Sequence, residues 1–115
     1  MANRVVRVVA EPDHADWEGY NLVLDLMIDD ENTIVMGRPY FGAQGAISSP
    51  EPLVFTTSGT LDFGSEYEEP ERTAETNLKA KAITFGEKFT VKQYNNQTYK
   101  KESVLYTIKK IEPMK

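Results

Sequence analysis

The segment that decides the fold is LKAKAITFGEKFTVKQYNNQTYKKESVLYTIKKIEP, residues 78–113. Apolar and polar side chains alternate along 89–91 and along 103–111, and a period of two is typical of β-strands. A glycine-containing connection at 86–88 and a polar cluster at 95–97 have the composition of hairpin turns. The segment therefore predicts three strands, at 83–85, 89–91 and 103–111.

The first half of the chain carries further strand signals. Residues 20–29 alternate strictly, which predicts a half-buried strand, and the β-branched run at 4–10 favours another. Asp13 is a candidate cap for a single helical turn over 13–17. Shorter strands are predicted at 33–36, 53–57 and 60–63, and long loops at 37–52 and 64–76.

These elements predict one all-β domain over residues 1–115, built as a small antiparallel barrel or a two-sheet sandwich with little helix. The apolar content of 40% and the charged content of 27% are close to globular averages. Alternation along the predicted strands assigns six side chains to the core: Leu24, Leu26, Phe89, Val91, Tyr106 and Ile108.

Charge is distributed unevenly along the chain. Residues 1–76 hold 15 Asp and Glu against 4 Arg, a balance of −11, whereas residues 77–115 hold 3 Glu against 9 Lys, a balance of +6; together these give the net charge of −5. Such asymmetry indicates either a surface for a charged partner or two parts that fold onto each other and mix their charges.

Several function classes lack the residues they need. There is no cysteine, and neither phosphate-binding glycine motif occurs, so thiol chemistry is excluded and a nucleotide cradle is not expected. The single histidine, His14, has no recognisable nucleophile, and the spacing of Asp25, Asp29, Asp30 and Glu31 does not match a calcium loop. We therefore expect no catalytic site, no metal and no cofactor.

The same reasoning bears on partners and location. The lysines and aromatic residues after residue 78 would suit a nucleic-acid groove, but the chain as a whole is acidic and has no arginine after Arg72, so nucleic acid is not the expected partner. No apolar run approaches the roughly 20 residues that span a bilayer, and the N-terminus has no signal-peptide pattern. The expected location is the cytoplasm or a virion.

The end of the chain has one family resemblance. GEKFTV at 86–91 and YTIKKIEP at 106–113 resemble the last strands of small SH3-like barrels, including those of phage head–tail connector proteins. The likeness covers less than a third of the chain and carries over no functional residue.

Three functions remain. The leading hypothesis is a non-enzymatic protein-interaction module, of the accessory, inhibitor or immunity type, whose acidic surface binds another protein with a basic surface. The alternatives are a structural subunit of a larger assembly, such as a phage connector or tail component, and a small-molecule-binding barrel with a deep apolar pocket beside Trp17 or Tyr40. The residues predicted to contact a partner are Glu66, Tyr67, Glu68, Glu69, Glu71, Tyr40 and Phe41.

Overall fold

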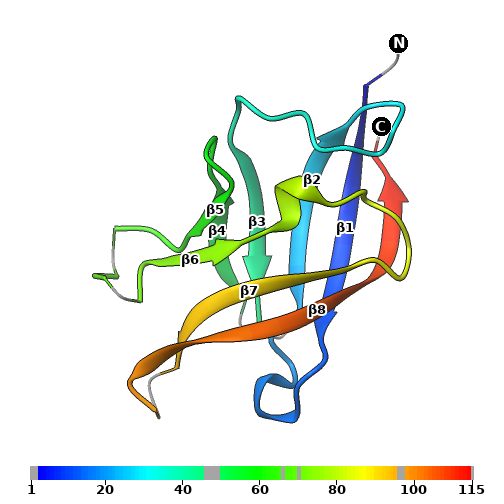
Figure 1. Ribbon diagram of the computed structural model, residues 1–115. Coiled ribbons are helices and arrows are strands. Elements are labelled where there is room, and N and C mark those ends of the chain that lie inside the picture. Colours follow the sequence, from blue (N-terminus) through cyan, green and yellow to red (C-terminus); the bar gives the residue numbers. More distant parts are fainter. Residues whose placement is uncertain (1–2, 46–49, 66, 70, 96–97, 115) are drawn as a thin grey trace.

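The computed structural model describes residues 3–45, 50–65, 67–69, 71–95 and 98–114, which form a closed antiparallel barrel (Figure 1). Of the two predicted architectures, the barrel is confirmed. Each strand pairs with its neighbour in sequence, and the last pairs with the first. The strands are β1 (Arg4–Pro12), β2 (Leu22–Ile28), β3 (Tyr40–Gln44), β4 (Glu51–Phe55), β5 (Thr60–Asp62), β6 (Thr73–Thr76), β7 (Lys88–Asn95) and β8 (Lys100–Pro113).

Two 3₁₀ turns complete the described part, η1 (Ala15–Trp17) and η2 (Leu78–Ala80). The helical turn predicted over 13–17 is thus present as η1. The contacts of the Asp13 side chain are with other strands: its carboxylate accepts hydrogen bonds from Lys88 Nζ at 2.8 Å and from Thr107 Oγ1 at 2.7 Å. Within the described residues, no helix is long and apolar enough to cross a membrane.

Strand β8 closes the barrel because it pairs with two strands in turn. Its first half, from Lys100 to Thr107, pairs with β7, and its second half, from Tyr106 to Pro113, pairs with β1. In Figure 1 the strand runs beside β7 and then turns upward beside β1. Opposite Val9 and Ala10 the register on β8 steps from Lys110 to Ile108, so Lys109 is the extra residue of a bulge in β8 at this bend, as is common where barrel strands turn.

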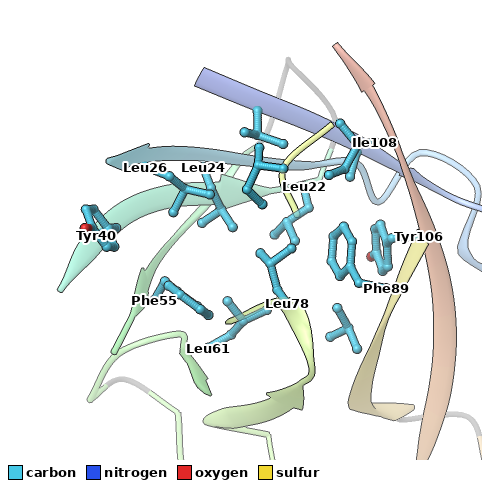
Figure 2. Packing of buried hydrophobic residues seen from close by; sticks show 14 of the residues in the cluster. Leu22, Leu24, Leu26, Tyr40, Phe55, Leu61, Leu78, Phe89, Tyr106 and Ile108 are labelled. Atoms are coloured by element: carbon cyan, nitrogen blue, oxygen red, sulfur yellow. The ribbon is translucent and has the colours of Figure 1, made fainter. Parts of the chain in front are cut away.

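The barrel interior is filled by side chains that alternate along the strands (Figure 2). On β2 the inward residues are those that the sequence pattern put on one face, and each is at most 1% exposed. The rings of Phe89 and Tyr106 stack with centroids 5.7 Å apart. All six residues predicted for the core are buried: Leu24, Leu26, Phe89, Val91, Tyr106 and Ile108.

The prediction of a loop over 37–52 was wrong, because β3 lies within it and β4 begins at Glu51. Gly42 suggested a loop, yet the strand requires it. A Cβ atom at this position would lie 2.2 Å from the carbonyl oxygen of Val23 and 2.6 Å from Leu24 Cδ2. A glycine inside a strand marks such a close approach of two backbones.

The strands predicted at 83–85 and 33–36 are also absent. Residues 33–36 form only isolated bridges, Ile34 with Ile28 and Thr33 with Ala82, and the second lies just before 83–85, where the connections after β2 and β6 meet. Ile83 is nevertheless buried, and its backbone N–H donates to Asn32 O at 2.7 Å. Apolar residues that anchor a connection resemble a short strand in sequence. The loop predicted at 64–76 is shorter than expected, because β6 takes its last four residues.

An up-and-down barrel places its connections alternately at its two ends. One end, called the mouth here, carries the connections β1–β2, β3–β4, β5–β6 and β7–β8. The other end carries the remaining connections and both ends of the chain, because β1 starts there and β8 finishes there. Segments far apart in sequence therefore meet at the mouth.

Replacing Leu24 by alanine tests the assignment of the β2 core face. Leu24 is 1% exposed, so Leu24→Ala is expected to lower the free energy of unfolding by about 2–5 kcal/mol. Chemical denaturation followed by circular dichroism measures this. Phe41→Ala is the matched control, since Phe41 is 70% exposed and its truncation should change stability by less than about 0.5 kcal/mol. Equal unfolding midpoints for the two variants would contradict the assignment.

Candidate functional site

The mouth of the barrel contains a pocket of about 460 Å³. Residues of the β1–β2, β5–β6 and β7–β8 connections line it, together with residues near the adjoining ends of β3, β4, β7 and β8. Its aromatic residues are Trp17, Tyr20, Phe63, Tyr67 and Tyr94. Its polar side chains include three carboxylates, on Glu51, Glu71 and Glu102, and three amides, on Gln44, Gln93 and Asn95.

The turn η1 brings two of the aromatic rings to the pocket. The N–H of Tyr20 donates to the carbonyl of Trp17 at 3.0 Å, and this short turn sets their rings edge to face, with centroids 5.4 Å apart and planes at 71°. Trp17 is 9% exposed, whereas Tyr20 is 45% exposed. The pair thus lines the pocket with one buried ring, that of Trp17, and one exposed ring, that of Tyr20.

A buried hydrogen-bond network lies beneath these rings and joins three strands. Gln44 Nε2 at the end of β3 donates to Gln93 Oε1 on β7 at 2.9 Å and to the hydroxyl of Tyr106 on β8 at 3.0 Å. The Tyr106 hydroxyl in turn donates to the carbonyl of Tyr20 at 2.9 Å. Burial raises the pKa of Tyr106, so its hydroxyl keeps its proton.

The carbonyl of Tyr20 fixes the orientation of the whole network. A carbonyl only accepts, so the single proton of the Tyr106 hydroxyl must point to it. The hydroxyl then accepts from Gln44, which must present its NH2 group to both neighbours. Gln93 must therefore meet Gln44 with its oxygen, while its own NH2 group lies near enough to the Tyr106 hydroxyl to offset part of the rise that burial causes in the pKa of that hydroxyl.

That NH2 group forms no hydrogen bond of ordinary geometry. Gln93 is 4% exposed, and its Nε2 is the one buried side-chain nitrogen or oxygen without a partner among the residues that the structure describes. An unsatisfied buried donor costs about 1–3 kcal/mol, and such groups are rare enough to need a reason. Gln93 also lines the pocket, but its Nε2 has almost no exposed surface, so this donor lies behind the pocket wall.

Carboxylates at the pocket are held in place by neighbouring donors. Glu102 accepts from Asn95 Nδ2 and from Thr98 Oγ1, each at 3.1 Å, and these two hydrogen bonds lower the pKa of Glu102. Across the pocket, the hydroxyl of Tyr67 donates to Glu51 Oε2 at 3.3 Å. Glu102 therefore presents an ionised acceptor to the pocket near neutral pH.

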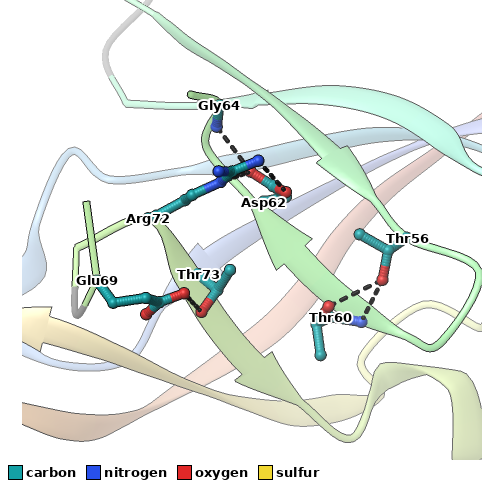
Figure 3. Close-up of polar contacts among 7 residues, drawn as sticks. All are labelled: Thr56, Thr60, Asp62, Gly64, Glu69, Arg72 and Thr73. Carbon is teal, nitrogen blue, oxygen red and sulfur yellow. Dashed lines mark hydrogen bonds and ion pairs between the residues drawn. The ribbon is translucent and has the colours of Figure 1, made fainter. Parts of the chain in front are cut away.

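The β5–β6 connection forms one side of the mouth, and its residues 64–71 are called the acidic loop here. The base of the loop is clamped (Figure 3). Asp62 accepts from the N–H of Gly64 at 2.8 Å and from Arg72 Nε at 3.3 Å, and the N–H of Phe63 donates to Arg72 O at 2.8 Å. The hydrogen bond from Gly64 and the pairing with Arg72 lower the pKa of Asp62.

The acidic loop also has internal order. The N–H of Tyr67 donates to Gly64 O at 3.2 Å, and the N–H of Glu71 donates to Glu68 O at 2.8 Å. Glu69 Oε1 accepts from Thr73 Oγ1 on β6 at 2.7 Å (Figure 3). Turns and side-chain bonds thus hold the described part of this loop in a defined shape.

The structure separates the residues predicted to contact a partner. Tyr67 and Glu71 line the pocket, and Glu68 and Glu69 are exposed on the acidic loop. Glu66 lies outside the described residues. Tyr40 and Phe41 are not brought to the mouth, because Tyr40 begins β3 at the opposite end. Tyr40 is buried there and donates to the carbonyl of Val35, whereas Phe41 is exposed on the outer face.

Sequence reasoning missed most of the pocket. It considered a ligand pocket beside Trp17, and a pocket is present there, but its lining is aromatic and polar instead of apolar. The network residues Gln44, Gln93 and Tyr106 are separated by up to 62 positions. A polar residue on the inward side of an alternating strand, as Gln93 is on β7, is the one signal that would have pointed to this site.

The other candidate clusters have structural roles. Asp25 forms a bidentate pair with Arg7, at 2.8 and 3.0 Å. Asp29 Oδ1 accepts the N–H groups of Glu31 and Thr33, each at 2.9 Å, which shapes the turn after β2. Within the described ranges no three histidine or carboxylate side chains gather as a metal site would require.

Removing the Asp62 carboxylate tests whether this clamp holds the acidic loop. Asp62→Ala is expected to speed amide hydrogen exchange within 64–71 by about tenfold, because the loop base loses its shared acceptor, while the global unfolding midpoint moves little. Asp30→Ala, in the exposed turn after β2, is the control. Equal exchange rates in the loop would show that the clamp does not order it.

Acid should loosen the loop of the unaltered protein in the same way. Because the folded-state pKa of Asp62 is lowered, the contribution of its charge is complete above the usual pKa of about 3.9 and is lost as pH falls through the lower folded value. Exchange in the loop, corrected for intrinsic rates, should therefore rise at low pH in the wild type. In Asp62→Ala it should show no such rise.

Comparison with known proteins finds no relative. No family model, curated protein or solved structure matches the chain. The residues at the mouth are therefore the basis on which a function has to be proposed.

Proposed function

We propose that the chain is a non-enzymatic protein-interaction module whose acidic loop binds a basic surface of another protein. The observation that carries this proposal is the clamp at the base of the loop, formed by Asp62, Gly64 and Arg72. A solvated linker of the same composition would have to lose conformational entropy on binding. A loop that is already ordered avoids much of that cost.

The charges of the loop support the same proposal. Glu68 and Glu71 are exposed, and in the described part of the chain neither forms an ion pair. Two further carboxylates, on Glu51 and Glu102, face the adjoining pocket and extend the negative charge across the mouth. Such a field acts over about 8–10 Å at physiological salt and mainly accelerates encounter with a partner of opposite charge.

Neutralising the loop tests the proposal. In the variant Glu66→Gln, Glu68→Gln, Glu71→Gln, association with the partner should slow by about tenfold or more and become less dependent on salt. Glu69 stays unchanged because it accepts a hydrogen bond from Thr73. Thermal stability should hardly change, since Glu68 and Glu71 are exposed and exposed charges contribute little to it.

The matched control removes three exposed carboxylates elsewhere: Glu11→Gln, Glu31→Gln, Glu112→Gln. Both variants have the same net charge, so a difference between them reports the location of the charges. The partner is obtained by affinity capture at low salt with the wild type and both variants as parallel baits, followed by stopped-flow association. Equal capture and equal rates for the two variants would overturn the proposal. A discrete large oligomer of the chain alone, measured by light scattering, would favour the structural-subunit alternative.

A further inference from the structure

We propose that the mouth pocket binds a quaternary ammonium group, carried either by a small molecule or by a fully methylated lysine side chain. This inference goes beyond the protein-interaction proposal and does not depend on it, because it rests on the lining of the pocket and not on the order of the acidic loop. Three observations carry it: the aromatic lining, the sign of the charge, and the hydrogen bonds that the carboxylates already accept.

Aromatic rings form a large part of the pocket lining. Five of the twelve lining residues are aromatic, whereas aromatic residues make up 10% of the chain. They come from separate parts of the barrel: Trp17 and Tyr20 from the β1–β2 connection, Phe63 and Tyr67 from the β5–β6 connection, and Tyr94 from β7. The face of an aromatic ring is negatively polarised and attracts a cation that lies within about 6 Å of the ring centre. A lining of this kind is typical of sites for quaternary ammonium ligands.

The charge of the pocket selects a cation. Glu51, Glu71 and Glu102 line it, and the described lining residues include no lysine or arginine. Hydrogen bonds lower the pKa of Glu102, and the charges of Lys100 and His14 lower it further, but neither of these two side chains lines the pocket. An anionic ligand would meet the carboxylates in a partly enclosed space, where like charges repel more strongly than in water. A neutral ligand would contact the rings and gain nothing from the charge.

The carboxylates already accept hydrogen bonds from the protein. The two oxygens of Glu102 accept one each, from Asn95 Nδ2 and from Thr98 Oγ1, at 3.1 Å. Glu51 Oε2 accepts from the hydroxyl of Tyr67 at 3.3 Å. A primary ammonium group brings three N–H donors that need acceptors, whereas a quaternary ammonium group brings none. The site therefore favours a cation that is held by charge and by ring faces alone.

The same features favour an organic cation over a metal ion. Within the described residues, no three carboxylate or histidine side chains gather closely enough to ligate a metal. The pocket volume of about 460 Å³ lies within the range of roughly 300–1,000 Å³ that small-molecule sites occupy. A quaternary ammonium group donates no hydrogen bond to water, so it loses less hydration on entering than the compact, strongly hydrated ammonium of lysine.

The fluorescence of Trp17 provides a direct assay, because this is the single tryptophan of the chain and it lines the pocket. Choline and tetramethylammonium are titrated at constant ionic strength, and calorimetry gives a second readout. The matched neutral probe has a tert-butyl group in place of the trimethylammonium group of choline, so it keeps the shape and lacks the charge. Ethanolamine serves as the primary ammonium probe and acetate as the anion. We expect choline to bind at least about tenfold more tightly than the neutral probe, and acetate to give no response.

The variant Tyr20→Leu tests the contribution of a ring. Tyr20 is 45% exposed, and its backbone carbonyl, which accepts from Tyr106, is kept in the variant. Choline affinity should fall by about fivefold or more, because one aromatic face is lost. Phe85→Leu is the matched control, since Phe85 is 75% exposed and lies in the β6–β7 connection at the opposite end of the barrel.

The variant Glu102→Gln tests the contribution of a charge. It keeps an acceptor oxygen for Asn95 and Thr98 and removes the negative charge. Choline affinity should fall by about threefold or more and become less dependent on salt. Glu112→Gln is the matched control, because Glu112 is exposed on the same strand at the end away from the mouth. Melting temperatures are measured first, and if one pocket variant does not fold, the other decides.

Each result decides the matter. Saturable choline binding that the pocket variants weaken and the controls keep supports the inference. Absence of a saturable response to choline, to tetramethylammonium and to a peptide that contains trimethyllysine overturns it. So does binding of the neutral probe or of ethanolamine as tight as that of choline, or a choline affinity that a folded pocket variant leaves unchanged. Binding of choline indicates a small-molecule ligand, and binding of the peptide alone indicates a methylated protein.

The two proposals of this article are tested by different variants. Tyr20→Leu leaves every carboxylate of the acidic loop in place, and the loop variant with three glutamines measures association with a basic protein separately. Either proposal can therefore fail while the other stands.

Discussion

The double pairing of β8 is the constraint on which the rest of the structure depends. The first half of the strand pairs with β7 and the second half pairs with β1. One chain segment therefore supplies backbone hydrogen bonds to both sides of the closure. A closed barrel has no unpaired sheet edge, and here that property rests on the bend in β8 and on the bulge that its Lys109 forms opposite Val9 and Ala10. Tyr106 lies near this bend and pairs with residues of both partners, Phe89 and Pro12.

The same residue links the closure to the candidate site. The ring of Tyr106 stacks on Phe89 in the core, while its hydroxyl connects Gln44 to the carbonyl of Tyr20 at the mouth. One side chain therefore contributes to apolar packing and sets the direction of a polar network. A barrel designed for stability alone would replace Gln44 and Gln93 by apolar residues. Their retention in the floor is what makes the mouth chemically distinct from the core beneath it.

The sequence predicted those parts of the fold in which local pattern and tertiary packing agree. The strict alternation of β2, and that of β7 and β8, assigned the inward faces correctly because each strand is buried on one side. The strand β3 could not be predicted in this way. Glycine is common in loops, so Gly42 pointed to a loop. The strand needs a glycine there because Val23 O lies close by, and this closeness exists only once β2 and β3 are paired. Conversely, Ile83 is of a residue type common in strands, but here it anchors a connection between strands.

The site was less predictable than the fold for a related reason. Acidic residues on one loop are visible in the sequence, and Tyr67 and Glu71 were named from it. Pairing between strands creates the clamp at Asp62 and Arg72 and the network at Gln44 and Gln93. The partners in each are far apart in the sequence, so local sequence patterns do not identify them. An amide on the inward side of a strand indicates that a partner must exist without indicating where it is.

The alternation of connections between the two ends of the barrel also fixes how the protein can be presented. Both chain ends leave the barrel at the end away from the mouth, where Val6 pairs with Pro113, and Figure 1 shows them close together. A tether attached to either end, whether a sensor surface or another domain, would therefore hold the molecule with its pocket and acidic loop facing outward into solution. Several copies fixed in this way on one surface would present their mouths side by side, so that weak contacts with a repeated partner would combine into strong attachment.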